Sequence, residues 1–215
     1  MKIKEFKLER LFARYKLQTK YMLSQSACEF CTMKEILAMA DDEEGYLSEH
    51  RDRSRGQGVD LVISCGDLDP DYLEFIESML NVPLLYVRGN HDGVYDVRPP
   101  RGCFDIDGKI YEAEGVRVLG LGGSLRYKDG PDMYSEDEMT WRVRRARVQS
   151  RLRGGVDIIA THAPARGWGD LDDYPHRGFE CFNDMLARMR TRFLLHGHVH
   201  MSYGRLQRCY EHPSG

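Results

Sequence analysis

The sequence contains five short apolar segments that each run into glycine, aspartate, asparagine or histidine. They span residues 59–64, 82–87, 116–121, 156–160 and 193–195. Continuous apolar, β-branched runs of this length are typical of strands buried on both faces, as in sheets that are covered by helices. In such α/β sheets, ligands bind beyond the carboxyl ends of the strands. The pattern therefore predicts an α/β fold in which the polar residues after these strands converge.

The residues at these strand ends are of the types that bind divalent metals. They are Asp67, Asn90, His91, Asp92, His162, His198 and His200. Carboxylate, amide oxygen and imidazole groups suit borderline metals such as Mn, Fe or Zn. His198 and His200 fall on one side of an extended segment, because side chains alternate along a strand. We therefore expect a metal site, with Asp67 on its glycine turn as the natural bridging carboxylate.

The same set of residues suits phosphoryl chemistry. Two metals about 3.5–4 Å apart clamp the attacking and leaving oxygens of a phosphoryl displacement and generate hydroxide at neutral pH. No side-chain base is then needed, and the remaining requirement is an acid for the leaving oxygen. His91 supplies an imidazole for that role, and the neighbouring Asp92 is expected to orient it.

Four short motifs follow one another in a characteristic order. They are Gly66-Asp67, Gly89-Asn90-His91-Asp92, Thr161-His162-Ala163-Pro164 and Gly197-His198-Val199-His200. Their order resembles that of the metallophosphoesterase (calcineurin-like phosphoesterase) superfamily, whose motifs run D-x-H, G-D-x-x-D, G-N-H-[DE], H and G-H-x-H. The likeness spans most of residues 59–200, and the strand-end context of each motif makes it specific.

The resemblance implies a fold and a role for each motif residue. The fold would be a four-layer α/β/β/α sandwich of two mixed sheets flanked by helices. Because only residues 201–215 follow the last motif, one sheet is expected to have a truncated C-terminal edge. Asp67 would bridge two divalent metals, and His91 would be the proton donor to the leaving group. The remaining ligands would be Asn90, His162 and His198 on one metal and His200 on the other.

The family's first motif, D-x-H, has an altered counterpart here. Aligning its strand with the apolar run 35–40 places Asp41 at the aspartate and Glu43 at the histidine, and glutamate is an acceptable ligand for Mn or Fe. Residues 1–33 instead resemble the N-terminal segment of pyridoxal-phosphate-dependent aminotransferases, without a cofactor lysine or phosphate cup. We expect a helical appendage at 1–33 and a metallophosphoesterase domain at 34–215. If the aminotransferase likeness extends to Asp41, that stretch is helical and neither acidic residue is a ligand.

The whole-chain composition argues against several classes of partner. A formal net charge of -3 gives no footprint for duplex nucleic acid. No apolar stretch approaches the roughly 18 residues of a membrane helix, so no membrane partner is expected. Six scattered cysteines suit a reducing compartment, which favours a cytoplasmic location. The arginine-rich run 142–153 is interpreted as the solvated face of a helix, with a phosphate-steering patch as the alternative.

Two functions from different classes fit these features. The first is a hydrolase that cleaves a small phosphomonoester or phosphodiester, using hydroxide held by two Mn, Fe or Zn ions and a histidine proton donor. The alternative is a degenerate domain that binds metal, phosphate ligands or a partner without turnover. A further hypothesis is an interaction module carried by residues 1–33.

Overall fold

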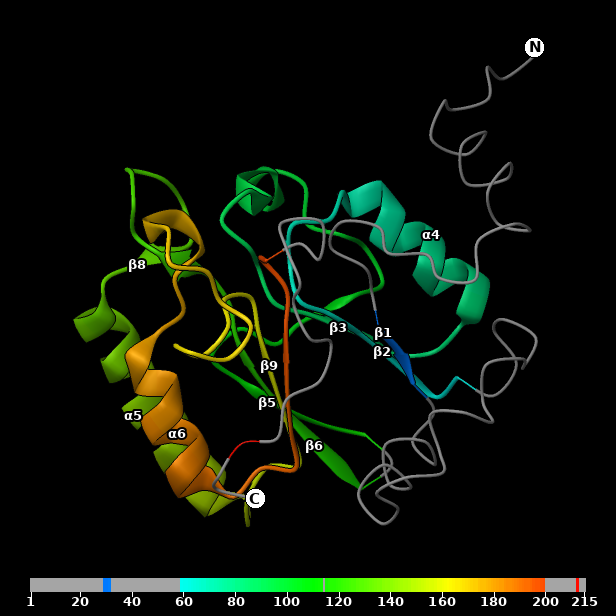
Figure 1. Ribbon diagram of the computed structural model, residues 1–215. Coiled ribbons are helices and arrows are strands. Elements are labelled where there is room, and N and C mark those ends of the chain that lie inside the picture. Colours follow the sequence, from blue (N-terminus) through cyan, green and yellow to red (C-terminus); the bar gives the residue numbers. More distant parts are fainter. Residues whose placement is uncertain (1–28, 32–58, 114, 200–211, 213–215) are drawn as a thin grey trace, which may run out of the picture.

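The computed structural model describes residues 29–31, 59–113, 115–199 and 212 of the 215-residue chain (Figure 1). The first sheet has the strand order β1-β2-β3-β4, with β1 at Glu29–Cys31, β2 at Leu61–Ser64, β3 at Leu84–Tyr86 and β4 at Phe104–Asp105. Strands β2, β3 and β4 run parallel, and β1 pairs with β2 in the antiparallel direction. The first sheet is therefore mixed.

The second sheet is also mixed and has the order β10-β9-β6-β5. Its strands are β5 at Ile110–Ala113, β6 at Val116–Leu121, β9 at Ile158–Thr161 and β10 at Phe193–His196. Strands β6, β9 and β10 run parallel, whereas β5 is antiparallel to β6. A separate parallel pair joins β7, Ser124–Leu125, to β8, Met133–Tyr134.

Three α-helices lie in the described part of the chain, and their ends follow ordinary capping rules. They are α4 at Pro70–Leu80, α5 at Glu136–Leu152 and α6 at Glu180–Met189, and two short 3-10 helices are η2 at Asp92–Asp96 and η3 at Tyr174–His176. The Asp69 side chain accepts a hydrogen bond from the Asp71 amide at the start of α4, with proline in the first turn. Helix α5 begins with a capping box between Ser135 and Glu138. Within the described residues, no helix combines the length and the apolar character needed to cross a membrane.

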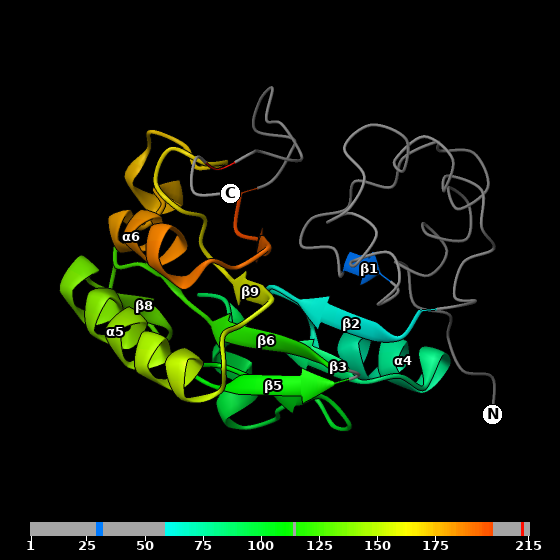
Figure 2. The ribbon, with the colours of Figure 1, turned by 90° about the horizontal axis from the view of Figure 1, so that it is seen from below.

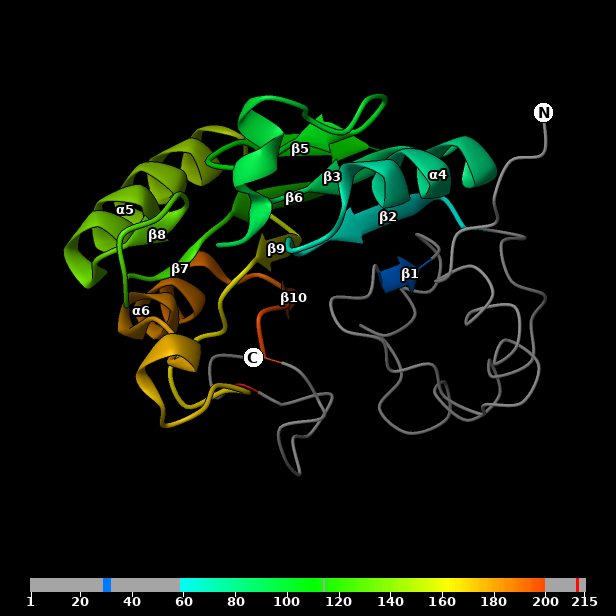
Figure 3. The ribbon, with the colours of Figure 1, turned by 90° about the horizontal axis from the view of Figure 1, so that it is seen from above.

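The hydrophobic core consists of three clusters, because side chains alternate between the two faces of each sheet. Leu61 and Ile63 of β2 pack with residues of the second sheet such as Val118 and Ile158. The intervening Val62 faces the other way, with Leu73 of α4. The third cluster joins the second sheet to α5 and α6 through Leu119, Ile159, Met139, Val143 and Phe182. Figures 2 and 3 show α4 on one side of the molecule and α5 with α6 on the other.

The structure confirms the predicted α/β class and all five predicted strands, whose ends shift by up to two residues. The arginine-rich run 142–153 lies in α5, with Arg153 as the C-cap, as expected of a helix face. Helix α6 and strands β4 and β5 were not predicted from the sequence. Strands β4 and β5 are short and lack a continuous apolar run, so their sequence carries little of the signal used for the others.

Of the predicted N-terminal appendage, residues 1–33, the structure describes only residues 29–31. Glu29–Cys31, which fall in the expected helical appendage, form strand β1 instead. Without β1, that edge of β2 would present unpaired backbone amide and carbonyl groups, and a strand satisfies them where a helix cannot. The division at residue 33 and the truncated sheet edge are otherwise untested and remain predictions. Asp41, Glu43 and His200 lie outside the described residues.

Candidate metal centre

The candidate site lies where β2, β3, β9 and β10 end. Two glycines let the loops after β2 and β3 approach closely. Gly66 has φ +92°, and a Cβ atom on it would lie 2.5 Å from the Gly89 nitrogen. A Cβ atom on Gly89 would lie 2.1 Å from Asp67 Oδ1. Any side chain at either position would push the loops apart, so these glycines allow Asp67, itself at φ 59°, to reach the site.

His162 is the centre of the arrangement and is fully buried. Its Nδ1 lies 2.6 Å from the Cys65 carbonyl oxygen, so Nδ1 carries the proton and donates it. Nε2 then presents a lone pair, which lies 3.1 Å from Asn90 Oδ1 and 3.4 Å from Asp67 Oδ2. The Asn90 amide is oriented by its nitrogen, which donates to the Tyr127 hydroxyl at 3.3 Å. In neutral His162, three electron-pair donors therefore face one another with no proton between them.

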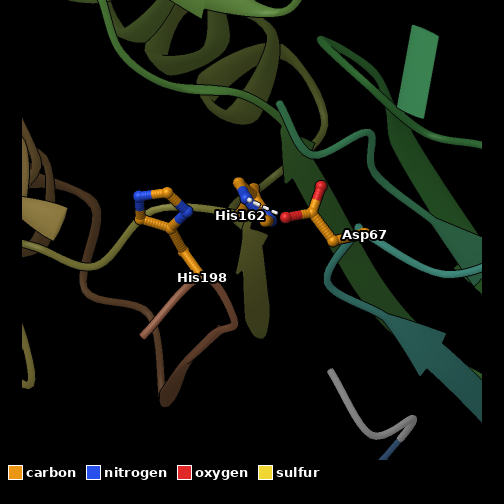
Figure 4. Close-up of side chains that lie close together, drawn as sticks. All are labelled: Asp67, His162 and His198. Atoms are coloured by element: carbon orange, nitrogen blue, oxygen red, sulfur yellow. Dashed lines mark ion pairs between the residues drawn. The ribbon is translucent and has the colours of Figure 1, made fainter. Parts of the chain in front are cut away.

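His198 adds a fourth electron-pair donor. Its Nε2 lies 2.7 Å from the Pro175 carbonyl oxygen, so Nε2 carries the proton and Nδ1 keeps the lone pair. Figure 4 shows one nitrogen of the His198 ring on the side of His162 and Asp67 and the other turned away. The two imidazole rings lie 4.8 Å apart between centroids. Asp67, His162 and His198 each place a ligand atom within 4.8 Å of those of the other two.

The electrostatics of the site favour the unprotonated ligands. Burial, together with the nearby His162, lowers the pKa of His198 to about 4. Burial alone would raise the pKa of Asp67, but the neighbouring His162 ring and the hydrogen bond from the His91 main-chain amide outweigh burial, so the pKa is lowered. Because metals bind neutral imidazole and ionised carboxylate, both groups are in the binding form at neutral pH.

Asp92 has a different role from the one expected. Its Oδ2 accepts hydrogen bonds from the Gly89 amide at 2.7 Å and the Asp67 amide at 2.8 Å, and no hydrogen bond joins it to the described His91 ring. A carboxylate that is only 2% exposed needs donors, and these main-chain amides are the nearest ones. Burial still raises the pKa of Asp92 to about 6. Asp92 therefore holds the loops after β2 and β3 together, behind the site.

His91 is exposed at the rim of the site. Its main-chain amide donates to Asp67 Oδ1 at 2.9 Å, which leaves Asp67 Oδ2 facing His162. The two carboxylate oxygens thus have separate partners: Oδ1 is held by the main chain and Oδ2 points to the ligand cluster. The His91 ring is accessible from solvent beside this cluster.

The structure therefore brings four of the predicted ligands together: Asp67, Asn90, His162 and His198. Sequence reasoning missed the groups that orient them. Tyr127 follows β7 in another loop that leaves a strand end, so the pattern of polar residues after strands could have suggested it. Cys65 and Pro175 act through main-chain carbonyls, which no pattern of side chains reveals.

The donor set fits a divalent metal. One carboxylate oxygen, one amide oxygen and two imidazole nitrogens form the mixed oxygen and nitrogen set that Mn, Fe and Zn accept. Both histidines donate their second ring nitrogen to a main-chain carbonyl, which fixes the tautomer that a ligand requires. A cation is the simplest partner for lone pairs that otherwise repel one another.

The fold and the site define a metal-binding α/β protein. The family model described as calcineurin-like phosphoesterase matches residues 39–202, so the chain belongs to that family. One solved structure, described only as a crystal structure, aligns at 15% sequence identity with a TM-score of 0.42. The alignment covers 61% of this chain and spans 58% of the other. The comparison with curated proteins found no match.

Proposed function

We propose that this protein is a metal-dependent phosphoesterase that hydrolyses a small phosphomonoester or phosphodiester. The convergence of lone pairs from Asp67, Asn90 and His162 carries the proposal, because it makes a site for a cation that has no other evident use. Membership of the calcineurin-like phosphoesterase family supports hydrolase chemistry at that site. When bound, divalent metals supply a nucleophile at neutral pH and neutralise charge on the phosphoryl oxygens.

The protein's own residues are proposed to bind the metal, to donate a proton and to position the ligands. Asp67, Asn90, His162 and His198 would hold one metal, with Asp67 also facing the second. His91 is proposed to donate a proton to the leaving oxygen, since its ring is exposed beside the ligand cluster while its amide is tied to Asp67. Asp92 positions Asp67 by holding its amide, which makes it a positioning residue in this proposal.

The proposal also includes a second metal, the four-layer fold, the identity of the metals and the location of the protein. A second divalent metal would use His200, with Asp41 and Glu43 completing its site. The packing of α4 on the first sheet and of α5 and α6 on the second supports the four-layer α/β/β/α sandwich as the fold. The identity of the metals as Mn, Fe or Zn follows from the chemistry of the donor set. The sparse cysteines support a cytoplasmic location as part of the proposal.

The test combines metal analysis with a chromogenic substrate. The full chain, loaded with Mn²⁺ and desalted, should contain two metals and cleave bis-para-nitrophenyl phosphate. The variant His91→Ala should lose most of the rate, by roughly 10²–10⁴-fold, while keeping its metals, because its ring is not a proposed ligand. Full metal content without cleavage in the wild-type protein would instead favour the degenerate, binding-only alternative. One metal or none would contradict the two-metal proposal.

A further inference from the structure

Helix α5 carries an apolar line on the face that is turned away from the core. Its inner face is buried through Met139, Val143 and other residues of the third core cluster. On the outer side, Trp141, Val148 and Leu152 are 60%, 57% and 83% exposed. Their spacing of seven and then four residues places them in one line along the helix. Exposed apolar residues scattered singly are ordinary, but an aligned set that includes a tryptophan marks a contact surface.

Arginines flank this apolar line. They are Arg144, Arg145, Arg147, Arg151 and Arg153, and none has an ion pair with a carboxylate among the described residues. Two other arginines near the helix do have such partners: Arg126 pairs with Glu138 at 2.7 Å and Arg142 pairs with Asp107. The Arg145 guanidinium lies 5.8 Å from the centroid of the Trp141 ring. The outer face therefore combines apolar residues with unneutralised positive charge.

The distribution of the charges indicates what kind of partner fits. The arginines extend from Arg144 to Arg153, on both sides of the apolar line. An anionic lipid surface is negative everywhere and attracts spaced arginines without any register, whereas a protein partner would use them only where its carboxylates stand at matching positions. Figures 2 and 3 show α5 as the outermost element on its side of the molecule, where an extended flat surface can reach it.

We propose that the outer face of α5 docks the protein on an anionic membrane surface. This α5 outer face consists of Trp141, Val148 and Leu152 with Arg144, Arg145 and Arg151. Helices that lie in the membrane interface combine tryptophan and leucine with arginine in this way. The indole ring sits at the headgroup level, and arginine side chains reach the lipid phosphates while their methylene groups stay among the apolar residues.

The proposal revises the expectation that the protein has no membrane partner. That expectation followed from the lack of an apolar segment long enough to span a bilayer, and none of the described helices could cross one. Docking through one helix face needs no spanning segment. The inference does not depend on the phosphoesterase proposal, because no residue of the metal centre takes part.

Vesicle sedimentation tests the proposal directly. The full chain should sediment with vesicles of phosphatidylcholine containing about one third phosphatidylglycerol, and not with pure phosphatidylcholine. The double variant Arg144→Glu/Arg151→Glu should weaken binding by more than about tenfold. The control, Arg98→Glu/Arg101→Glu, makes the same change in net charge at exposed positions beside α4, on the side of the first sheet, and should bind like the wild type.

The fluorescence of Trp141 provides a second measurement that does not depend on reversing charges. The chain has two tryptophans, so Trp168→Phe leaves Trp141 as the only indole. Its emission should shift to shorter wavelength when phosphatidylglycerol vesicles are added, and the shift should disappear at high salt. If the wild-type protein fails to sediment with these vesicles, or if the charge control weakens binding as much as the α5 variant, the proposal is overturned.

Discussion

The two sheets contribute different chemistry to the candidate metal centre. The first sheet supplies oxygen ligands from Asp67 and Asn90. The His91 amide donates a hydrogen bond to Asp67, and the Asn90 side-chain nitrogen donates one to the Tyr127 hydroxyl. The second sheet supplies nitrogen ligands, and both are held by main-chain carbonyl acceptors. The orienting partner of Asp67 thus differs in kind from those of the two histidines, because a carboxylate is fixed by donors and a neutral imidazole by an acceptor.

The difference has consequences for stability as well as for binding. Asp67 is only half-buried, and a carboxylate there gains its position from main-chain amides. His162 is fully buried and fills space between the loops of both sheets. We therefore expect changes on the first-sheet side to affect metal affinity above all, and changes at His162 to affect folding too.

The largest effect is expected for Asp67→Asn. This change keeps the shape of the side chain but removes the only carboxylate among the four described ligands. Loss of partners that merely orient a ligand lowers metal affinity by about 10–100-fold, so loss of this ligand should lower it by about 100-fold or more. Titration of Mn²⁺ into the metal-free protein by calorimetry measures the change. Affinity within tenfold of the wild type would mean that Asp67 is not a ligand.

For His162→Ala we expect a loss of both metal and stability. Removing a fully buried ring leaves a cavity and deprives the Cys65 carbonyl of its donor, which should cost about 3 kcal/mol in the free energy of unfolding. Urea unfolding with a chelator present separates this cost from metal binding. Asp67→Asn is the matched comparison and should stay within about 1 kcal/mol of the wild type. Equal losses in the two variants would remove the proposed distinction between the two halves of the site.

Substitutions of Asp92 test the first-sheet half of the site without removing a metal ligand. Asp92→Ala leaves the Gly89 and Asp67 amides without an acceptor, so we expect unfolding to become easier by about 2 kcal/mol and metal affinity to fall by about 10-fold or more. Asp92→Asn keeps an oxygen at the same place and should recover most of both quantities. Were the Asp92→Asn variant no better than Asp92→Ala in either measurement, the role of Asp92 would depend on its charge and not on these hydrogen bonds.

The smallest effect concerns pH. Burial raises the pKa of Asp92 from 3.8 to about 6, so the folded state holds its proton more tightly than the unfolded state does. The contribution of this residue to stability is therefore greatest below pH 3.8 and is lost as the pH rises through 6. In metal-free protein, the wild type should lose about 1–2 kcal/mol relative to Asp92→Asn across that interval. A constant difference between the two proteins over these pH values would contradict the assignment.

Much of the fold and of the candidate site could be predicted from the sequence alone. The strands at 61–64, 84–86, 158–161 and 193–196 combine apolar runs with strand-end ligands, and both signals are local. Parallel strands then bring their ends to one edge, so residues 72 positions apart, Asn90 and His162, lie in hydrogen-bond distance. The apolar strands and the polar residues after them were enough to predict the site, because parallel strands bring these residues to the same edge of the fold.

The parts that could not be predicted depend on packing between loops. That Asp92 serves the main chain rather than His91 depends on which donors surround a buried carboxylate after folding. The tautomers of His162 and His198 depend on carbonyl groups of Cys65 and Pro175, which every residue type provides equally. Strand β1 depends on a free edge of β2, which is a property of the folded sheet.

The central claim is that Asp67, Asn90, His162 and His198 surround one metal, and anomalous diffraction tests it most directly. Crystals of the full chain grown with Mn²⁺ should give an anomalous peak within about 2.0–2.5 Å of Asp67 Oδ2, Asn90 Oδ1, His162 Nε2 and His198 Nδ1. Such a peak would place the cation where the four lone pairs now meet. Crystals grown with Mn²⁺ that show no anomalous peak among these four atoms would contradict the account.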